Sequence, residues 1–520
     1  MKLLNNMKKY QLFRSISLLC LITPLLIIAY KWTKTPNTFQ HLYPGHIYTV
    51  TYEFDLSKLD KDVFVKAFLP RSNERQDIKD QTLHGNSYSF SKETNEFGDR
   101  GIWKVKDTRD IIISHQFKVE SQSLKYELPD SMSYEFHYPS DIKQYLQPSD
   151  FIQSDHHLID SIAKQLKGTE LRSTLNSNFE FVKQITNSHT GILTDAITVL
   201  ERQRASCNGK SRLFVALCRA QGIPAKLVGG IILEESRKRT SHLWAEVFYQ
   251  NEWIPFDILN EHFAELPSNY LELYTGDHFL ITHSKDISFD YQFLIDHNYS
   301  SAIAEANSYP LWNLVNRSNL PIRLWRGLLI LPVAGLVIAI FRNVIGFKTF
   351  GIFLPALIGL ALVNHHLWWG LFAMGIVILA VVLVHYPLEK IGMMHIPKVM
   401  IMMIIVILSI IGLSIIGVQN DWQKLGTTIL LPIIILSITA ERFAKTLVEE
   451  HPGDAFRILG NTMLLAMICY PLFQAEILIG ILLTYPEVYF LIIGVLLLLG
   501  RWIGMRLSEF NRFALIVKAH

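Results

Sequence analysis

Three residues that could act together in chemistry occur in order within one short stretch of the chain: Cys207, His242 and Asp257. A cysteine thiolate attacks carbonyl carbons, a histidine moves the proton, and a third polar group holds the imidazole in the right tautomer. The set therefore predicts a thiol site that breaks or transfers an amide. In it Cys207 is the nucleophile, His242 the acid and base, and Asp257 the orienting group.

The sequence after the cysteine predicts a helix. Apolar residues recur at helical spacing from Cys207 to Gln221, Gly222 suits the C-terminal cap, and Pro224 prevents continuation. Cys207 would then begin the helix, where unpaired N–H groups and the helix dipole stabilise an anion. Cys218 would lie about 16 Å away along the same helix, too far for a disulfide.

Two short strands are predicted to carry the other two residues. Residues 242–249 and 253–259 show strand composition, and the tight turn between them puts His242 within about two residues of register from Asp257. Because side chains alternate along a strand, Trp244 shares one face with His242. We expect the faces that carry His242 and Asp257 to point toward the helix of Cys207.

Four more residues are expected to support the site or to bind substrate: Gln203, Trp244, Glu246 and Trp253. The backbone N–H of Cys207 is the expected donor to an oxyanion, and Gln203 and Trp244 are further candidates. The sequence contains no Cys-x-x-Cys motif and no oxygen-rich loop of calcium-binding spacing. We therefore expect neither a metal nor another cofactor.

The 520 residues are too many for one domain. Basic residues and then an apolar run, without a small-x-small cleavage site, predict a signal anchor over 1–30. Alternating apolar residues predict a β-rich extracytoplasmic domain over 31–149, and the thiol domain follows over 150–320. The apolar region 321–505 predicts a domain of seven transmembrane helices, and residues 506–520 would form a cytoplasmic tail.

Seven apolar spans are expected after the soluble part, near 323–341, 350–363, 367–386, 398–418, 427–440, 458–480 and 486–502. With the anchor they make eight crossings, so both termini would lie on one side. Lys and Arg concentrate in the loops of that side, which places the termini in the cytoplasm and the soluble domains outside the inner (plasma) membrane. The lipid bilayer is therefore an expected partner.

Two other classes of function are disfavoured. A net charge of +3 and the lack of a basic stripe with interleaved aromatic residues argue against nucleic-acid binding. A proton pump or ion carrier would bury a chain of ionisable groups, and the apolar spans contain few of them.

The region from about 150 to 300 resembles the transglutaminase-like branch of the papain-like thiol superfamily. The matching pieces are Cys207 at a helix start, Gly222-Ile-Pro-Ala-Lys, His242-Leu-Trp-Ala-Glu-Val and Trp253-Ile-Pro-Phe-Asp. One departure is Ala205, because many active members have Gly-x-Cys. With its apolar C-terminal region, the whole chain is similar to bacterial proteins described as an inactive transglutaminase fused to seven transmembrane helices.

The fold class that follows is α+β, with a papain-like/transglutaminase core, an N-terminal β domain and an all-α polytopic membrane bundle. One function is that of a thiol acyltransferase or amidohydrolase, related to cysteine proteases, acting on a peptide or protein amide. The alternative is a catalytically inactive peptide-binding scaffold or sensor coupled to its membrane helices. The resemblance also implies association with ATP-grasp peptide ligases.

Overall fold

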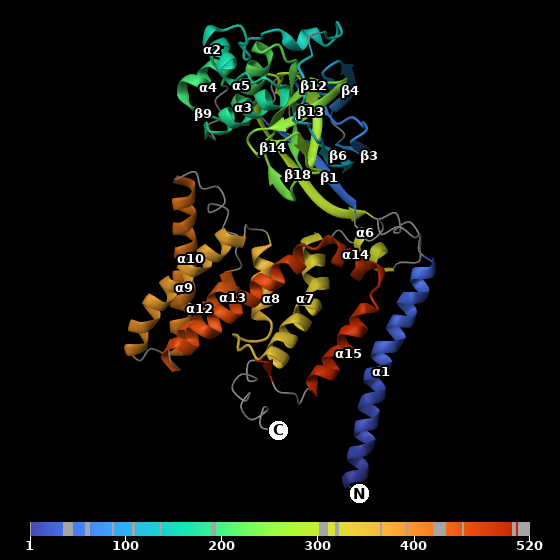
Figure 1. The fold of residues 1–520 in the computed structure, drawn as a ribbon, viewed down its shortest axis with the longest axis vertical. Helices are drawn as coiled ribbons and strands as arrows, with labels where there is room; N and C mark the ends of the chain where they lie inside the picture. Colours follow the sequence, from blue (N-terminus) through green and yellow to red (C-terminus); the bar gives the residue numbers. More distant parts are fainter. Residues whose placement is uncertain are drawn as a thin grey trace. The chain divides into compact units, whose positions relative to one another are not determined.

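A computed structural model shows the chain as two compact units, one formed by residues 45–299 and the other by residues 1–44 with 300–520 (Figure 1). It describes residues 2–34, 45–57, 63–85, 88–106, 110–135, 137–188, 194–285, 287–300, 310–317, 322–363, 367–391, 394–419, 433–449, 452–501 and 506–507. Residues 364–366, between two of the predicted spans, and most of the predicted tail lie outside these residues. Each unit is described by itself.

The unit of residues 45–299, called the soluble unit below, contains two facing sheets built mainly from its N-terminal strands. One sheet has the order β11-β18-β1-β6-β3 and the other the order β17-β2-β5-β4. The strands are β1 (Gly45–Ser57), β2 (Val63–Leu69), β3 (Gln76–His84), β4 (Tyr88–Asn95), β5 (Gly98–Val105), β6 (Ile111–Ser121), β11 (Ser236–Lys238), β17 (Ile281–His283) and β18 (Ser288–Ser300). Alternate residues of β1 are buried, and Phe54 meets Trp103 of the opposite sheet edge to face.

The soluble unit begins and ends on neighbouring strands. His46 near the start of β1 and His297 near the end of β18 approach to 2.8 Å between Nδ1 and Nε2. Further along, Gln292 donates to Glu53 at 3.0 Å. The two strands therefore run in opposite directions, and the chain enters and leaves the unit at one corner of a sheet.

A second five-stranded sheet, of order β14-β13-β12-β10-β16, lies at the centre of the region that the sequence assigns to the thiol domain. Its strands are β10 (Ala225–Ile232), β12 (His242–Tyr249), β13 (Glu252–Asp257), β14 (His262–Phe263) and β16 (Tyr270–Thr275), and its helices are α2 (His157–Leu166), α3 (Leu171–Lys183), α4 (Ala196–Arg202) and α5 (Cys207–Ala220). Helix α5 is buried from Gly209 to Cys218, and Gly222 follows it with φ +81°, as expected of a C-terminal glycine.

Smaller elements connect these parts. They are β7 (Leu124–Lys125), which pairs with β15 (Glu265–Leu266), the parallel pair β8 (Thr186–Asn187) and β9 (Arg204–Ala205), and the 3₁₀ helix η2 (Lys143–Leu146). Strands β11, β17 and β18 come from the second half of the soluble sequence and complete the sheets of the first half. The boundary predicted between residues 149 and 150 thus falls inside one compact unit.

The other unit is helical. It contains α1 (Lys2–Lys34), α6 (Pro310–Arg317), α7 (Ile322–Ile340), the π-helix η3 (Phe341–Ile345), α8 (Leu354–Leu362), α9 (Leu367–Lys390), α10 (His395–Gln419), α12 (Ile433–Glu449), α13 (Pro452–Gln474), α14 (Glu476–Thr484) and α15 (Val488–Gly500). Helix α1 packs on α15, where Lys31 pairs with Glu487 at 2.5 Å. The predicted fold class is therefore confirmed: β-sheets, a thiol-domain core and a region of apolar helices.

Within the described residues, five helices are long and apolar enough to cross a membrane, or six if the bent pair α14 and α15 counts as one span. The pair bends by 99°. The predicted span 350–363 contains only the nine residues of α8, and part of the span predicted at 427–440 lies outside the described residues. The number of seven spans stays a prediction.

Candidate active site

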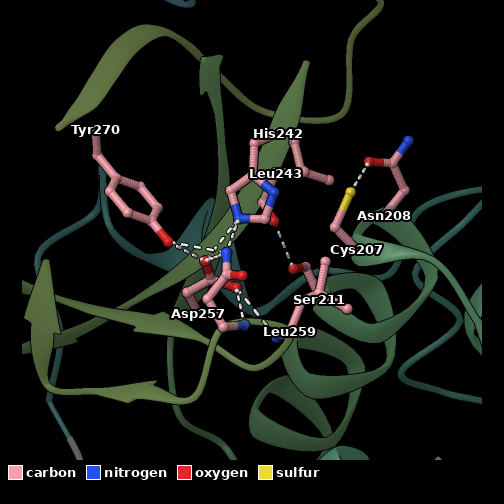
Figure 2. Close-up of polar contacts among 9 residues, drawn as sticks. Cys207, Asn208, Ser211, His242, Leu243, Asp257, Leu259 and Tyr270 are labelled. Atoms are coloured by element: carbon pink, nitrogen blue, oxygen red, sulfur yellow. Dashed lines mark hydrogen bonds and ion pairs between the residues drawn. The ribbon is translucent and has the colours of Figure 1, made fainter. Parts of the chain in front are cut away.

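The three residues expected to act together lie near one another, each at a terminus of its helix or strand. Cys207 is the first residue of α5 and is half-buried, His242 is the first residue of β12, and Asp257 is the last residue of β13. Nε2 of His242 lies 2.6 Å from Oδ2 of Asp257 (Figure 2). Asp257 follows Phe256, which pairs with Ala245, so it stands two positions from His242 in register. This is the register that the sequence predicts.

One part of the prediction is wrong. Helix α5 packs on the opposite face of the hairpin, where Phe214 contacts Phe256 at 5.4 Å between ring centroids and Ser211 donates to the Leu243 carbonyl. The reason is alternation, because Leu243 and Ala245 make the more apolar face and this face covers the helix. His242 approaches Cys207 because each residue begins its element, not because the strand face points at the helix.

Asp257 is completely buried, and five donors satisfy its two oxygens. The backbone N–H groups of Leu259 and Asn260 donate to Oδ1. Oδ2 accepts from His242, from the Tyr270 hydroxyl at 2.6 Å and from the Asn260 amide at 2.8 Å (Figure 2). Burial alone would raise the pKa of Asp257, but His242, Tyr270 and Asn260 outweigh it and lower the pKa to about 2.

The same pair determines the charge of the histidine, whose side chain is 7% exposed. Burial by itself lowers the pKa of His242, but the Asp257 charge and hydrogen bond, together with the interaction with Cys207, raise it to about 10. His242 is therefore an imidazolium at neutral pH. With Nε2 directed at Asp257, the other ring nitrogen, Nδ1, faces the side where Cys207 lies (Figure 2).

Cys207 is the first residue of a helix whose N-terminus has no side-chain cap. Ser206 occupies the N-cap position of α5 without a capping hydrogen bond from its side chain, so the first N–H groups are left for an anion. The Sγ of Cys207 is 3.4 Å from Oδ1 of Asn208 (Figure 2). Ala205, the predicted departure from Gly-x-Cys, belongs to the short strand β9, whose extended backbone any residue can adopt.

Of the four residues expected to support the site, one contacts it. Trp244 is fully buried, with its ring 6.4 Å from the His242 ring. Gln203 instead donates to the Leu200 carbonyl of its own helix. Glu246 pairs with Lys226 at 3.1 Å, and Lys226 also covers the ring of Trp253. These last residues lie at the far end of the hairpin.

The prediction missed three residues of the site. Asn260 could have been found, because an asparagine three residues after a strand-ending aspartate is typical of a turn in which side chains bond the backbone. Asn208 follows Cys207 directly in the sequence, and this adjacency is a signal that could have identified it. Tyr270 has no local signal, since it starts the edge strand β16 and reaches Asp257 only through the tertiary fold.

A cavity of about 70 Å³ adjoins the site. Its lining is mixed, with aromatic and polar side chains: Phe151, Asn208, Arg212, Ser241, His242, Leu243, Tyr274, Asp277, His278, Phe279 and Leu280. The guanidinium of Arg212 binds both oxygens of Asp277, at 2.9 and 2.6 Å. Because this pair neutralises itself, the cavity offers polarity without a large net charge.

A thiol at a helix start, with a histidine and an aspartate on neighbouring strands, defines a transglutaminase-like core. Residues 161–258 match the transglutaminase-like superfamily. Residues 284–517 match a family described as 7 transmembrane helices usually fused to an inactive transglutaminase. The chain is therefore a multi-pass membrane protein that has a transglutaminase-like domain and, after it, a region similar to the helices of that family.

Solved structures show weaker similarity. A candidate cysteine protease from Cytophaga hutchinsonii is 15% identical with a TM-score of 0.43, over 50% of this chain and 92% of that chain. The periplasmic domain of TgpA from Pseudomonas aeruginosa is 11% identical with a TM-score of 0.23, over 42% of this chain and 92% of that one. No curated protein matches the chain significantly.

Proposed function

We propose that this membrane protein is a thiol enzyme that acts on peptide-like amides outside the cytoplasm, by hydrolysis or by acyl transfer. The observation that carries the proposal is the buried His242–Asp257 pair, 2.6 Å apart, beside a cysteine at a helix start. A buried ion pair adds little net stability over well-packed apolar residues of similar size, although removing only one partner is destabilising. Here it keeps an imidazolium next to a thiol, which is the arrangement that thiol acyl chemistry needs.

The reaction follows from the positions of the groups. The Cys207 thiolate attacks the amide carbon, and a C–S bond forms as the carbonyl oxygen becomes an oxyanion. N–H groups at the start of α5 stabilise that oxyanion. The C–N bond then breaks while Nδ1–H of His242 gives its proton to the leaving amine. Asp257 stays ionised and holds the ring through Nε2.

The acyl-enzyme is resolved by a second nucleophile. Neutral His242 accepts a proton through Nδ1 from water or from an amine as either attacks the thioester, and Cys207 leaves as a thiolate. Water gives hydrolysis, and an amine gives acyl transfer. The cavity beside His242 is small and lined by both ring and polar side chains. It suits one short side chain of a substrate better than a large apolar group.

The family description as usually inactive supports a second candidate function, a protein that binds a peptide without cleaving it. In this reading the cleft recognises a peptide and the membrane helices relay or scaffold the event, in association with an ATP-grasp ligase. A peptide affinity that survives Cys207→Ala, without thiol reactivity in the wild type, would favour this candidate.

The test is alkylation of the full-length protein in detergent by iodoacetamide across pH, read by mass spectrometry of each cysteine peptide. Cys207 should react far faster than Cys218 at pH 6.5, because Cys218 is buried and burial raises its pKa to about 12. His242→Ala should slow Cys207 by roughly tenfold or more, equivalent to at least about 1.4 kcal/mol of lost thiolate stabilisation.

Equal and slow alkylation of Cys207 and Cys218 at pH 6.5 would refute the enzyme proposal. A fast reaction of Cys207 that His242→Ala leaves unchanged would also count against it, because the histidine would then have no part in activating the thiol.

A further inference from the structure

We propose that the N-terminal β-region completes the thiol site, with Gln76 and Arg75 acting as positioning residues for Asp257 through Tyr270. This inference rests on the proposed function, because it assigns a role within the same site. It gives the strands before residue 122 a positioning role in the thiol site.

The contact lies at the outer edge of the central sheet. Strand β16 is the edge strand, so alternate backbone groups face away from β10. At Glu272 the side chain of Gln76 takes the place of a neighbouring strand: its Oε1 accepts from the backbone N–H at 2.9 Å, and its Nε2 donates to the carbonyl at 2.9 Å. Two residues earlier, Arg75 donates to the carbonyl of Tyr270.

The segment that supplies these side chains is itself fixed. Oδ1 of Asn73 accepts from the backbone N–H groups of Arg75 and Gln76, both at 2.9 Å. Nε2 of Gln76 also donates to the carbonyl of Arg71 at 2.8 Å. Gln76 is 2% and Arg75 7% exposed, so water cannot easily replace either side chain at the strand edge.

A change at the sheet edge can reach the site because Tyr270 contacts both the N-terminal β-region and Asp257. Its backbone carbonyl accepts from Arg75, and its hydroxyl donates to Oδ2 of Asp257 at 2.6 Å. The same carboxylate oxygen lies 2.6 Å from Nε2 of His242. Moving β16 outward by a fraction of an ångström would lengthen the Tyr270–Asp257 hydrogen bond and loosen the support of the histidine.

The arrangement is more than general packing. Any strand or solvent could satisfy the free backbone groups of an edge strand. Here one buried side chain binds the carbonyl of Tyr270 itself, the tyrosine that holds Asp257, and a second binds both backbone groups of Glu272, two residues later. The proposal therefore predicts coupling that runs through the Tyr270 hydroxyl. A purely structural role predicts lower stability without such coupling.

The experiment is a double-mutant cycle in the full-length protein, with Gln76→Ala, Tyr270→Phe and both together. The readout is the rate of Cys207 alkylation by iodoacetamide from pH 5.5 to 9. Gln76→Ala alone should slow alkylation at pH 6.5 by roughly threefold to tenfold, about the size of one net hydrogen bond, because only part of the loss of its three hydrogen bonds to Arg71 and Glu272 reaches the site. In the Tyr270→Phe background it should have almost no further effect.

The matched control is Gln116→Ala, which removes a side-chain hydrogen bond to Thr51 in the same N-terminal sheet and none of the hydrogen bonds that Gln76 and Arg75 make to β16. It should leave the alkylation profile unchanged. If Gln76→Ala yields no folded protein, Gln76→Glu replaces it, since the glutamate keeps the acceptor for the Glu272 N–H and replaces the donor to the Arg71 and Glu272 carbonyls with a second acceptor.

Two results would overturn the inference. One is a wild-type alkylation profile that Gln76→Ala or Gln76→Glu leaves unchanged. The other is a slowing that is equally large in the Tyr270→Phe background. Both differ from failure of the proposed function, in which the wild-type Cys207 itself lacks enhanced reactivity.

Discussion

The buried His242–Asp257 pair should make the stability of the soluble unit depend on pH in a defined way. Removing the carboxylate charge by Asp257→Asn keeps the side-chain shape. A pKa of about 10 for His242, against 6.5 in the unfolded chain, corresponds to about 5 kcal/mol in favour of the imidazolium at low pH. Loss of one partner of a buried pair typically costs about 3–5 kcal/mol, which is consistent.

The direction follows from proton linkage. The pKa of His242 is raised by folding, so its stabilisation is complete below pH 6.5 and is lost as the pH rises through about 10. The pKa of Asp257 is lowered to about 2, so its contribution is present above pH 3.8 and is lost as the pH falls through about 2. Between these limits, from about pH 4 to 6.5, the pair stabilises most.

The difference in unfolding free energy between wild type and Asp257→Asn should therefore be about 4 kcal/mol at pH 6.5 and about 1 kcal/mol at pH 9.5. Pulse proteolysis in urea, applied to the full-length protein, measures it from the soluble fragment. The control is Asp290→Asn, which breaks an exposed pair with Arg239 and should cost less than about 1 kcal/mol at both pH values. A cost of Asp257→Asn that is equal at the two pH values would refute the reasoning.

Two further substitutions test the surroundings of the site. Burial lowers the pKa of Lys210 to about 8, so the desolvation of its charge opposes folding below pH 8 and ceases to do so above pH 10.5. Lys210→Met should therefore stabilise the soluble unit at pH 6.5 by up to about 3 kcal/mol. In the same proteolysis assay this gain should shrink by pH 10. A Cβ at Gly230 would lie 1.8 Å from the carbonyl oxygen of Leu271. Gly230→Ala should therefore destabilise the soluble unit by about 3 kcal/mol or more. The control is Gly375→Ala, which has open space around its Cβ and should leave the yield of full-length protein unchanged.

The sequence predicts the parts of the site that depend on neighbours in the chain. The hairpin of His242 and Asp257 is local, and its register follows from two turn residues, Gln250 and Asn251, which both have positive φ. The helix start at Cys207 and its end before Gly222 follow from capping and periodicity. These features need no knowledge of the rest of the fold.

What the sequence does not predict depends on distant contacts. Tyr270 reaches Asp257 from an edge strand, and Gln76 reaches that strand from 196 residues away. The prediction of the hairpin face that covers α5 is wrong for a different reason: Leu243 and Ala245 mark the more apolar face in the sequence, and the expectation followed His242 and Asp257 instead. In the membrane region hydropathy locates apolar sequence, but it does not show that α14 and α15 form a bent pair.

The adjacent ends of the soluble unit have a mechanical consequence. Strands β1 and β18 run in opposite directions, and His46 and His297 mark the corner where the chain enters and leaves. Tension on the two connecting segments would break the backbone hydrogen bonds between β1 and β18 one pair at a time, starting from one end. It would not load all of these hydrogen bonds together in shear. A pull on these segments would therefore separate β1 from β18 at low force, starting at the two histidines.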